Sequence, residues 1–269
     1  MPAPIRLPTY FISHGGGPWP WMERELGDQY RVLRTFLQDL PGTLPDAPKA
    51  ILVITGHWET ETLRISAGER PGMIYDYYNF PPHTYEVSYP APGDPTLASR
   101  ISTLLEQSGF NAQLDPERGF DHGTFVPLSV MYPEAKVPVV MLSMLNHRDP
   151  ATHMALGQAL APLRDEGVLI IGSGLSYHNL RLMNQAGAEP SRQFDDWLQD
   201  TLTQQDTNTR MERLQHWSQA PGARIAHAEE DHLVPLFVAA GAAEEDRGEC
   251  VHHEPDFFGH ITVSSFRFG

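Results

Sequence analysis

The chain has 269 residues, of which 41% are hydrophobic and 20% charged, as in an ordinary globular protein able to bury a large core. Its formal net charge of -15 would repel nucleic-acid phosphates and anionic membrane surfaces, so we expect neither as a partner. The single Cys250 excludes an internal disulfide and cysteine-rich metal sites. Because no run of 18 apolar residues occurs either, we expect a cytoplasmic protein without a membrane span.

Apolar and β-branched runs predict the first elements in chain order. Strands are expected over 7–13 and 50–55, with a helix over 23–40 between them. The order strand–helix–strand favours a parallel sheet with crossover helices. A Tyr-, Pro- and His-rich stretch over 71–92 predicts a long irregular segment instead.

The later elements follow from periodicity and from capping residues such as Asp94. Helices are predicted over 94–107, 149–164, 191–205 and 231–240, buried strands over 137–143 and 168–171, and a half-exposed strand over 261–268. We see no repeat and no linker. The fold class expected is therefore α/β: a single domain, residues 1–269, with a mainly parallel or mixed sheet flanked by helices.

Five histidines lie at the end of apolar segments or just beyond them: His14, His57, His122, His178 and His232. In α/β proteins the carboxyl ends of buried strands line up along one rim, where ligands bind. A convergent set of neutral imidazoles is what a catalytic metal requires. The sequence therefore predicts a metalloenzyme with its site at the strand-end rim.

Each histidine also has a structural interpretation. His14 precedes three glycines that could serve only a turn, and His57 could cap the sheet by bonding a carbonyl. His122 lies in a loop-like segment where a substrate contact and a turn are equally plausible, and Asp121 could orient an imidazole there. The acids before His232 could merely complement a helix dipole.

Other chemistries fit less well. The segment Gly172-Ser173-Gly174 before His178 does not match the Gly-x-Ser-x-Gly elbow of serine hydrolases. His227 is a weaker alternative to His232, and His83 could line a pocket. The remaining histidines suggest surface or packing roles: His147, His153, His216, His252, His253 and His260.

The five histidine segments, taken together and in order, resemble the class III extradiol ring-cleavage dioxygenases, the superfamily of the protocatechuate 4,5-dioxygenase catalytic subunit. The segments Tyr89-Pro90-Ala91-Pro92-Gly93 and Gly119-Phe120-Asp121-His122-Gly123 are most similar to its DOPA 4,5-dioxygenase-like branch. The resemblance extends from about Leu7 to the final strand. It implies an α/β sandwich with the site at one rim, and cleavage of a catechol by O2 to a muconic semialdehyde.

Carried over by motif, the resemblance implies that His14, His57 and His232 bind the metal. His178 matches the general base, and His122 matches a histidine that binds substrate or donates a proton. Protocatechuate-type members use a glutamate as third ligand, so Glu229, Glu230 and Asp231 stay open as alternatives to His232. Fe(II) is the expected working metal, although Zn(II) would also suit the site.

Aromatic residues of the irregular segment offer a wall for a flat ring. Tyr78 and Phe80 are the predicted substrate-binding residues, with Tyr77 and Tyr85 beside them. For a carboxylate on the substrate, Arg118 and Arg181 are candidates only by their position near motifs.

Two other functions use the same histidines. A zinc hydrolase of an amide or ester would add a carboxylate base such as Glu59 or Glu230. A non-catalytic metal-binding relative would bind metal without turnover. The partners expected for the dioxygenase are a small aromatic diol and O2, and the sequence leaves a homo-oligomer open.

Overall fold

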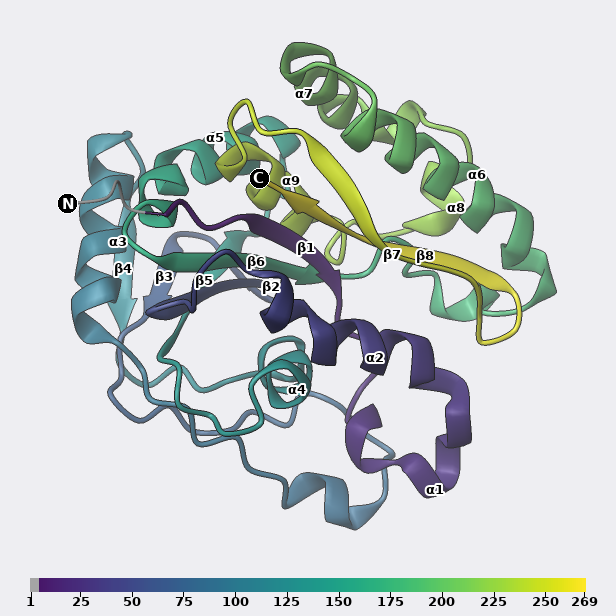
Figure 1. Ribbon diagram of the computed structural model, residues 1–269, viewed down its shortest axis with the longest axis horizontal. Helices are drawn as coiled ribbons and strands as arrows, with labels where there is room; N and C mark the ends of the chain where they lie inside the picture. The colour runs from purple at the N-terminus through teal and green to yellow at the C-terminus, as the bar shows by residue number, and fades with distance from the viewer. Residues whose placement is uncertain (1–4) are drawn as a thin grey trace.

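Eight strands form one mixed sheet in the computed structural model, which describes residues 5–269 (Figure 1). Their order across the sheet is β4-β3-β5-β2-β6-β1-β8-β7. The strands are β1 Thr9–Ser13, β2 Ala50–Thr60, β3 Leu63–Ser66, β4 Ala112–Asp115, β5 Val139–Leu145, β6 Val168–Gly174, β7 Gly248–Phe257 and β8 Ile261–Phe268. The four central strands, β5, β2, β6 and β1, are parallel, whereas β3 and β8 run antiparallel to their inner neighbours.

Helices cover both faces of this sheet (Figure 1). On one face α5 packs against α9, and α9 lies on β6 and β1; on the other, α4 lies on β2 and contacts α2. The helices are α1 Glu23–Leu26, α2 Arg31–Asp39, α3 Pro95–Gln107, α4 His122–Met131, α5 Pro150–Leu160, α6 Gln185–Thr203, α7 Thr207–Gln215, α8 Ala223–Ala226 and α9 Val234–Ala242. The predicted α/β class, with a mixed sheet between helices, is confirmed.

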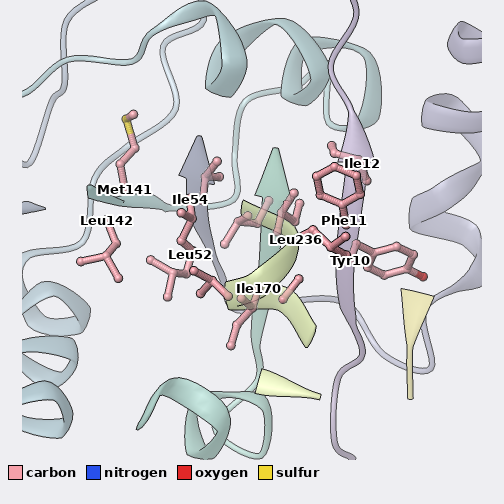
Figure 2. Packing of buried hydrophobic residues seen from close by; sticks show 14 of the residues in the cluster. Tyr10, Phe11, Ile12, Leu52, Ile54, Met141, Leu142, Ile170 and Leu236 are labelled. Atoms are coloured by element: carbon pink, nitrogen blue, oxygen red, sulfur yellow. The ribbon is translucent and has the colours of Figure 1, made fainter. Parts of the chain in front are cut away.

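The central strands contain long apolar runs because both of their faces are buried there. In β2, residues 51–54 are at most 1% exposed. Figure 2 shows Leu236 of α9 among side chains of β1, β2 and β6, including Phe11 and Ile170. This core fixes the strand ends relative to one another, and the register places Thr55 of β2 opposite Ser173 of β6.

Three predictions about elements need correction. The helix expected over 23–40 is interrupted at Gly27, whose φ of 55° ends α1 before α2 begins. The final strand β8 is almost wholly buried rather than half-exposed, because α6 covers it and its serine hydroxyls find partners: Ser264 Oγ lies 3.1 Å from His253 Nδ1, and Ser265 Oγ accepts from Ser13 N. His122 begins a helix rather than lying in a loop.

Strands β3, β4 and β7 were not predicted. The irregular segment over 71–92 is confirmed, since it holds a single short 3-10 helix, Pro82–Tyr85. None of the described helices has the length and apolar character needed to cross a membrane.

Candidate metal centre

The carboxyl ends of three parallel strands carry the site. His14 directly follows β1, and His178 lies four residues beyond the end of β6. His57 belongs to β2 where the pairing with β5 shifts register between Ile54 and Glu59, an irregularity that re-aims side chains. His122 opens α4, and His232 lies just before α9. The structure thus brings the five predicted histidines to one rim.

Close backbone contact brings the segment before α9 onto this rim. Leu175 N donates to the carbonyl of His232, at 3.1 Å. A Cβ on Gly174 would lie only 2.1 Å from that carbonyl oxygen, so only glycine allows the approach. The glycines after His14 serve a different purpose: Gly15 and Gly17 have positive φ and leave room for the rings of Trp19 and Phe80.

Three imidazoles turn one nitrogen each toward a common point. His57 Nε2 lies 3.3 Å from His14 Nε2 and 3.1 Å from His232 Nε2. Two nitrogens about 2.1 Å from one cation would be roughly 3.0 Å apart at a right angle and 3.4 Å apart at the tetrahedral angle. The spacing of these three residues therefore fits a divalent metal with open positions.

The opposite nitrogen of each ring, Nδ1, faces an oxygen that can accept a hydrogen bond from it. His14 Nδ1 lies 3.0 Å from Ser173 Oγ, whose own proton goes to the Gly123 carbonyl. His232 Nδ1 lies 2.8 Å from Asp231, and His57 Nδ1 lies 3.4 Å from Asp76. A neutral imidazole carries one proton, so an acceptor at Nδ1 leaves the lone pair of Nε2 free for a metal.

Burial keeps these rings neutral. Desolvation and the neighbouring histidines hold the pKa values of His14 and His57 well below the usual value of 6.5. Burial likewise lowers the pKa of His232 to about 4, although Asp231 opposes the shift. Burial alone would raise the pKa of Asp231, but the facing imidazoles of His178 and His232 bring it below its usual range. Neutral imidazoles beside an ionised carboxylate are the state that binds a metal.

Two further histidines flank this trio. His178 stacks on His232 with ring centroids 3.4 Å apart, and its Nδ1 faces Asp231. The ring of His122 lies 3.9 Å from that of His57, and His122 Nδ1 lies 2.8 Å from Asp76. Each therefore has Nε2 available for a molecule bound at the rim.

The acidic residues before His232 are engaged elsewhere. Glu229 pairs with Arg148 at 2.6 Å, and Glu230 with Arg224 at 2.8 Å. Asp231 contacts His232 at Nδ1, the nitrogen opposite the one that faces His57. The geometry favours His232 over these carboxylates as the third ligand.

The predicted aromatic residues differ in their exposure and in their distance from the site histidines. Tyr78 is 80% exposed, whereas Phe80 is half-buried against Gly17 and the ring of Tyr77. Tyr77 is the aromatic residue that meets a site histidine, with its ring 5.8 Å from that of His122 in an edge contact. The hydroxyls of Tyr77 and Tyr75 donate to carbonyls of their own segment, so they brace it from within.

Several other candidates have structural partners. Asp121 caps α4 by accepting from Thr124 N and pairs with Arg118, so it does not orient an imidazole. Burial, opposed by Arg118, raises the pKa of Asp121 to about 6. His227 is buried with Nε2 on the Ser176 carbonyl, His83 bonds Trp21, and Arg181 is exposed.

Sequence reasoning missed two residues that hold the histidines. Asp76 lies in the irregular segment, where no periodicity marks it, and only its proximity in space to His57 and His122 reveals its place. Ser173 was noted only for a motif that it does not match. Its pairing with Ile12 of β1, two residues before His14, is what places it beside that ring.

Comparisons with known proteins agree with this geometry. The family model for the catalytic LigB subunit of aromatic ring-opening dioxygenase matches residues 9–269. A 4,5-DOPA dioxygenase extradiol from Beta vulgaris is 42% identical over 97% of this chain and 96% of its own length. The dioxygenase tasH from Hapsidospora irregularis is 39% identical over 97% of this chain and 85% of its own length.

A solved structure of an uncharacterized protein from Escherichia coli K12 shares the fold, with a TM-score of 0.78 and 30% identity over 98% of this chain and all of the other. Dependence on a non-haem metal follows from the family and fits the histidine cluster. The predicted DOPA-like branch and extradiol ring cleavage are confirmed, and the chain belongs to the family of LigB-type aromatic ring-opening dioxygenases.

Proposed function

We propose that this chain opens the ring of a single-ring catechol outside its diol pair, with Fe(II) held by His14, His57 and His232. The observation that carries the proposal is the spacing of the three Nε2 atoms, with each Nδ1 facing an acceptor. Relatives from Beta vulgaris and Portulaca grandiflora are named for DOPA, which suggests a catechol bearing an amino-acid side chain.

A ferrous ion at these nitrogens would supply Lewis acidity toward the catechol and an electronic link to oxygen. His178, through Nε2, would accept the proton of one catechol hydroxyl. His122, or His178 once it holds that proton, would return a proton as the O–O bond breaks. Both oxygen atoms enter the product, a muconic semialdehyde, so the reaction needs no other reductant.

We further propose that the irregular segment contacts the substrate ring. Tyr78 and Phe80 remain the residues predicted from sequence, and Tyr77 joins them because its ring touches that of His122. We also propose that residues 1–269 act as one catalytic domain, and that zinc can replace iron in the isolated protein. A cytoplasmic location and a homo-oligomer stay predictions.

A zinc hydrolase is less well supported. Its candidate bases are both in ion pairs, Glu59 with two nitrogens of Arg148 at 2.7 and 3.1 Å, and Glu230 with Arg224. A carboxylate held by an arginine is a poor acceptor for the proton of a bound water.

The decisive experiment measures oxygen consumption by protein reconstituted anaerobically with Fe(II) and offered DOPA and simpler catechols. We expect one O2 per catechol and a yellow ring-cleavage product. His178→Ala should lower kcat about 100- to 10,000-fold, as loss of a general base does. His216→Ala, an exposed histidine outside the site, is the matched control and should keep full activity.

Ester or amide hydrolysis without oxygen uptake, at full iron occupancy, would overturn the proposal in favour of the hydrolase. Iron binding with no turnover of any catechol would favour a non-catalytic relative.

A further inference from the structure

Asp76 lies between two histidines of different proposed roles. Its Oδ1 accepts from His122 twice, from the backbone N–H at 3.0 Å and from Nδ1 at 2.8 Å. Its Oδ2 lies 3.4 Å from Nδ1 of His57. The carboxylate comes from the irregular segment and thereby joins β2 to the first turn of α4. One side chain thus faces a proposed metal ligand and a proposed substrate-contacting histidine.

Asp231 repeats this arrangement on the other side of the trio. Its Oδ2 lies 2.8 Å from Nδ1 of His232. Its Oδ1 is buried, has no hydrogen-bond partner among residues 5–269, and lies 3.7 Å from Nδ1 of His178. His178 and His232 stack face to face, and the Nδ1 atoms of both rings face this carboxylate. A small ring rotation would close the longer contact.

An ionised carboxylate can only accept hydrogen bonds, so it selects the Nδ1–H form of every neutral imidazole whose Nδ1 faces it. In each of the two histidines that face one carboxylate, Nε2 is then free of a proton: one Nε2 binds the metal, and the other exchanges a proton with the substrate. Because the two histidines share one carboxylate, the tautomer of one depends on the tautomer of the other.

We propose that Asp76 and Asp231 are positioning residues that each fix the tautomer of one metal-ligating and one acid–base histidine. The pairs are His57 with His122, and His232 with His178. The roles of these histidines rest on the proposed function, whereas their tautomers can be observed without it.

The two Asp→Asn variants should differ, because an amide offers one acceptor oxygen and one donor NH2. In Asp76→Asn the oxygen should stay with His122, which donates to it twice, and the NH2 should face His57. His57 would then accept at Nδ1 and carry its proton on Nε2, which cannot bind a metal. In Asp231→Asn the oxygen should stay with His232, so His178 would change tautomer instead.

The first measurement is long-range 1H–15N NMR of the histidine rings in metal-free protein, at about pH 8, where neutral imidazoles predominate. In the unmodified chain all four rings should carry the proton on Nδ1. In Asp76→Asn the ring of His57 should move to the Nε2–H form, and in Asp231→Asn that of His178. Asp195→Asn is the matched control, a buried aspartate beside His253 outside the site, and should leave all four rings unchanged.

The second measurement is the affinity for Co(II), used as a probe and measured by competition with a chelator. Asp76→Asn should weaken binding about 10- to 100-fold. Asp231→Asn should keep the affinity of the control but lower kcat for ring cleavage, with KM little changed.

An Nε2–H form for any of the four rings in the unmodified chain would overturn the proposal, and this outcome needs no variant to fold. Equal loss of metal affinity in both variants would also overturn it, since that would indicate a general disturbance of the site. If the chain opened no catechol, only the kcat comparison would be lost, so the two proposals fail separately.

Discussion

At the scale of single residues, buried histidines determine how the protein responds to acid. His153 in α5 is fully buried, its Nδ1 donates to the Asp149 carbonyl, and its Nε2 accepts from Leu145 N at 3.1 Å. Protonation would remove that acceptor. Burial accordingly lowers the pKa of His153 to about 4, although the bond to Asp149 opposes the shift. This ring serves the fold and lies outside the histidine cluster.

We predict that His153 makes the protein less stable as the pH falls below the unfolded pKa of about 6.5. Between this value and about 4 the unfolded chain binds a proton that the folded chain refuses, so the free energy of unfolding decreases toward low pH. From pH 7 to pH 5 the loss due to this one residue should be about 2 kcal/mol.

The measurement is urea denaturation at both pH values for the unmodified chain and for His153→Gln, whose side-chain oxygen can still accept from Leu145. The variant should lose about 2 kcal/mol less stability over that range. His216→Gln, an exposed control, should behave like the unmodified chain. Parallel pH dependence in all three proteins would contradict the prediction.

Some residues of the site could be predicted because they follow a strand that is recognisable in the sequence, whereas others could not. His14, His57 and His178 follow apolar runs, and parallel strands bring their ends together, so their proximity was predictable. Asp76 had no such mark, because its segment has no regular structure and its place depends on tertiary packing alone. The resemblance, rather than any periodicity, singled out His232 among its acidic neighbours.

At the scale of elements, three strands were not predicted from the sequence and the exposure of a fourth was predicted wrongly, each for a physical reason. Strands β3 and β4 have only four residues each, too few for a period of two to be recognised. Strand β7 contains Pro255 and two register shifts, which its place at the sheet edge tolerates. The polar residues of β8 suggested exposure, yet the side chains of Ser264 and Ser265 are buried because His253 and the backbone of Ser13 bond their hydroxyls.

Glycines determine how closely elements pack around the site, and Gly174 at the end of β6 is the sharpest case. A Cβ there would lie 2.1 Å from the carbonyl oxygen of His232, so Gly174→Ala must push the segment carrying His232 away from the rim. We expect a loss of about 1–3 kcal/mol in unfolding free energy, the usual cost of overpacking, together with weaker metal binding.

Gly42→Ala is the matched control, because a Cβ at Gly42 would have nothing within 4 Å. It should change stability by less than about 0.5 kcal/mol and leave metal affinity intact. Chemical denaturation and Co(II) titration of both variants make the comparison. The packing argument fails if Gly174→Ala matches Gly42→Ala in both measurements.

At the scale of the whole molecule, the metal site joins parts of the chain that are distant in sequence. His14 follows β1, His57 belongs to β2, and His232 precedes α9, which itself packs on β1 and β6. Unfolding separates these segments, so the unfolded chain has no preformed site for the metal. A metal that binds only the folded chain stabilises it by mass action.

We therefore predict that Zn(II), used as a redox-inert probe, raises the thermal unfolding temperature of the chelator-treated protein. Free metal at 100 times its Kd should add about 2.7 kcal/mol, which for a chain of this size corresponds to roughly 5–10 °C. His57→Ala should abolish the shift, since it removes the nitrogen that lies between the other two. His216→Ala should retain it. A shift that survives in His57→Ala would place the stabilising zinc elsewhere on the molecule and would argue against the three-histidine site.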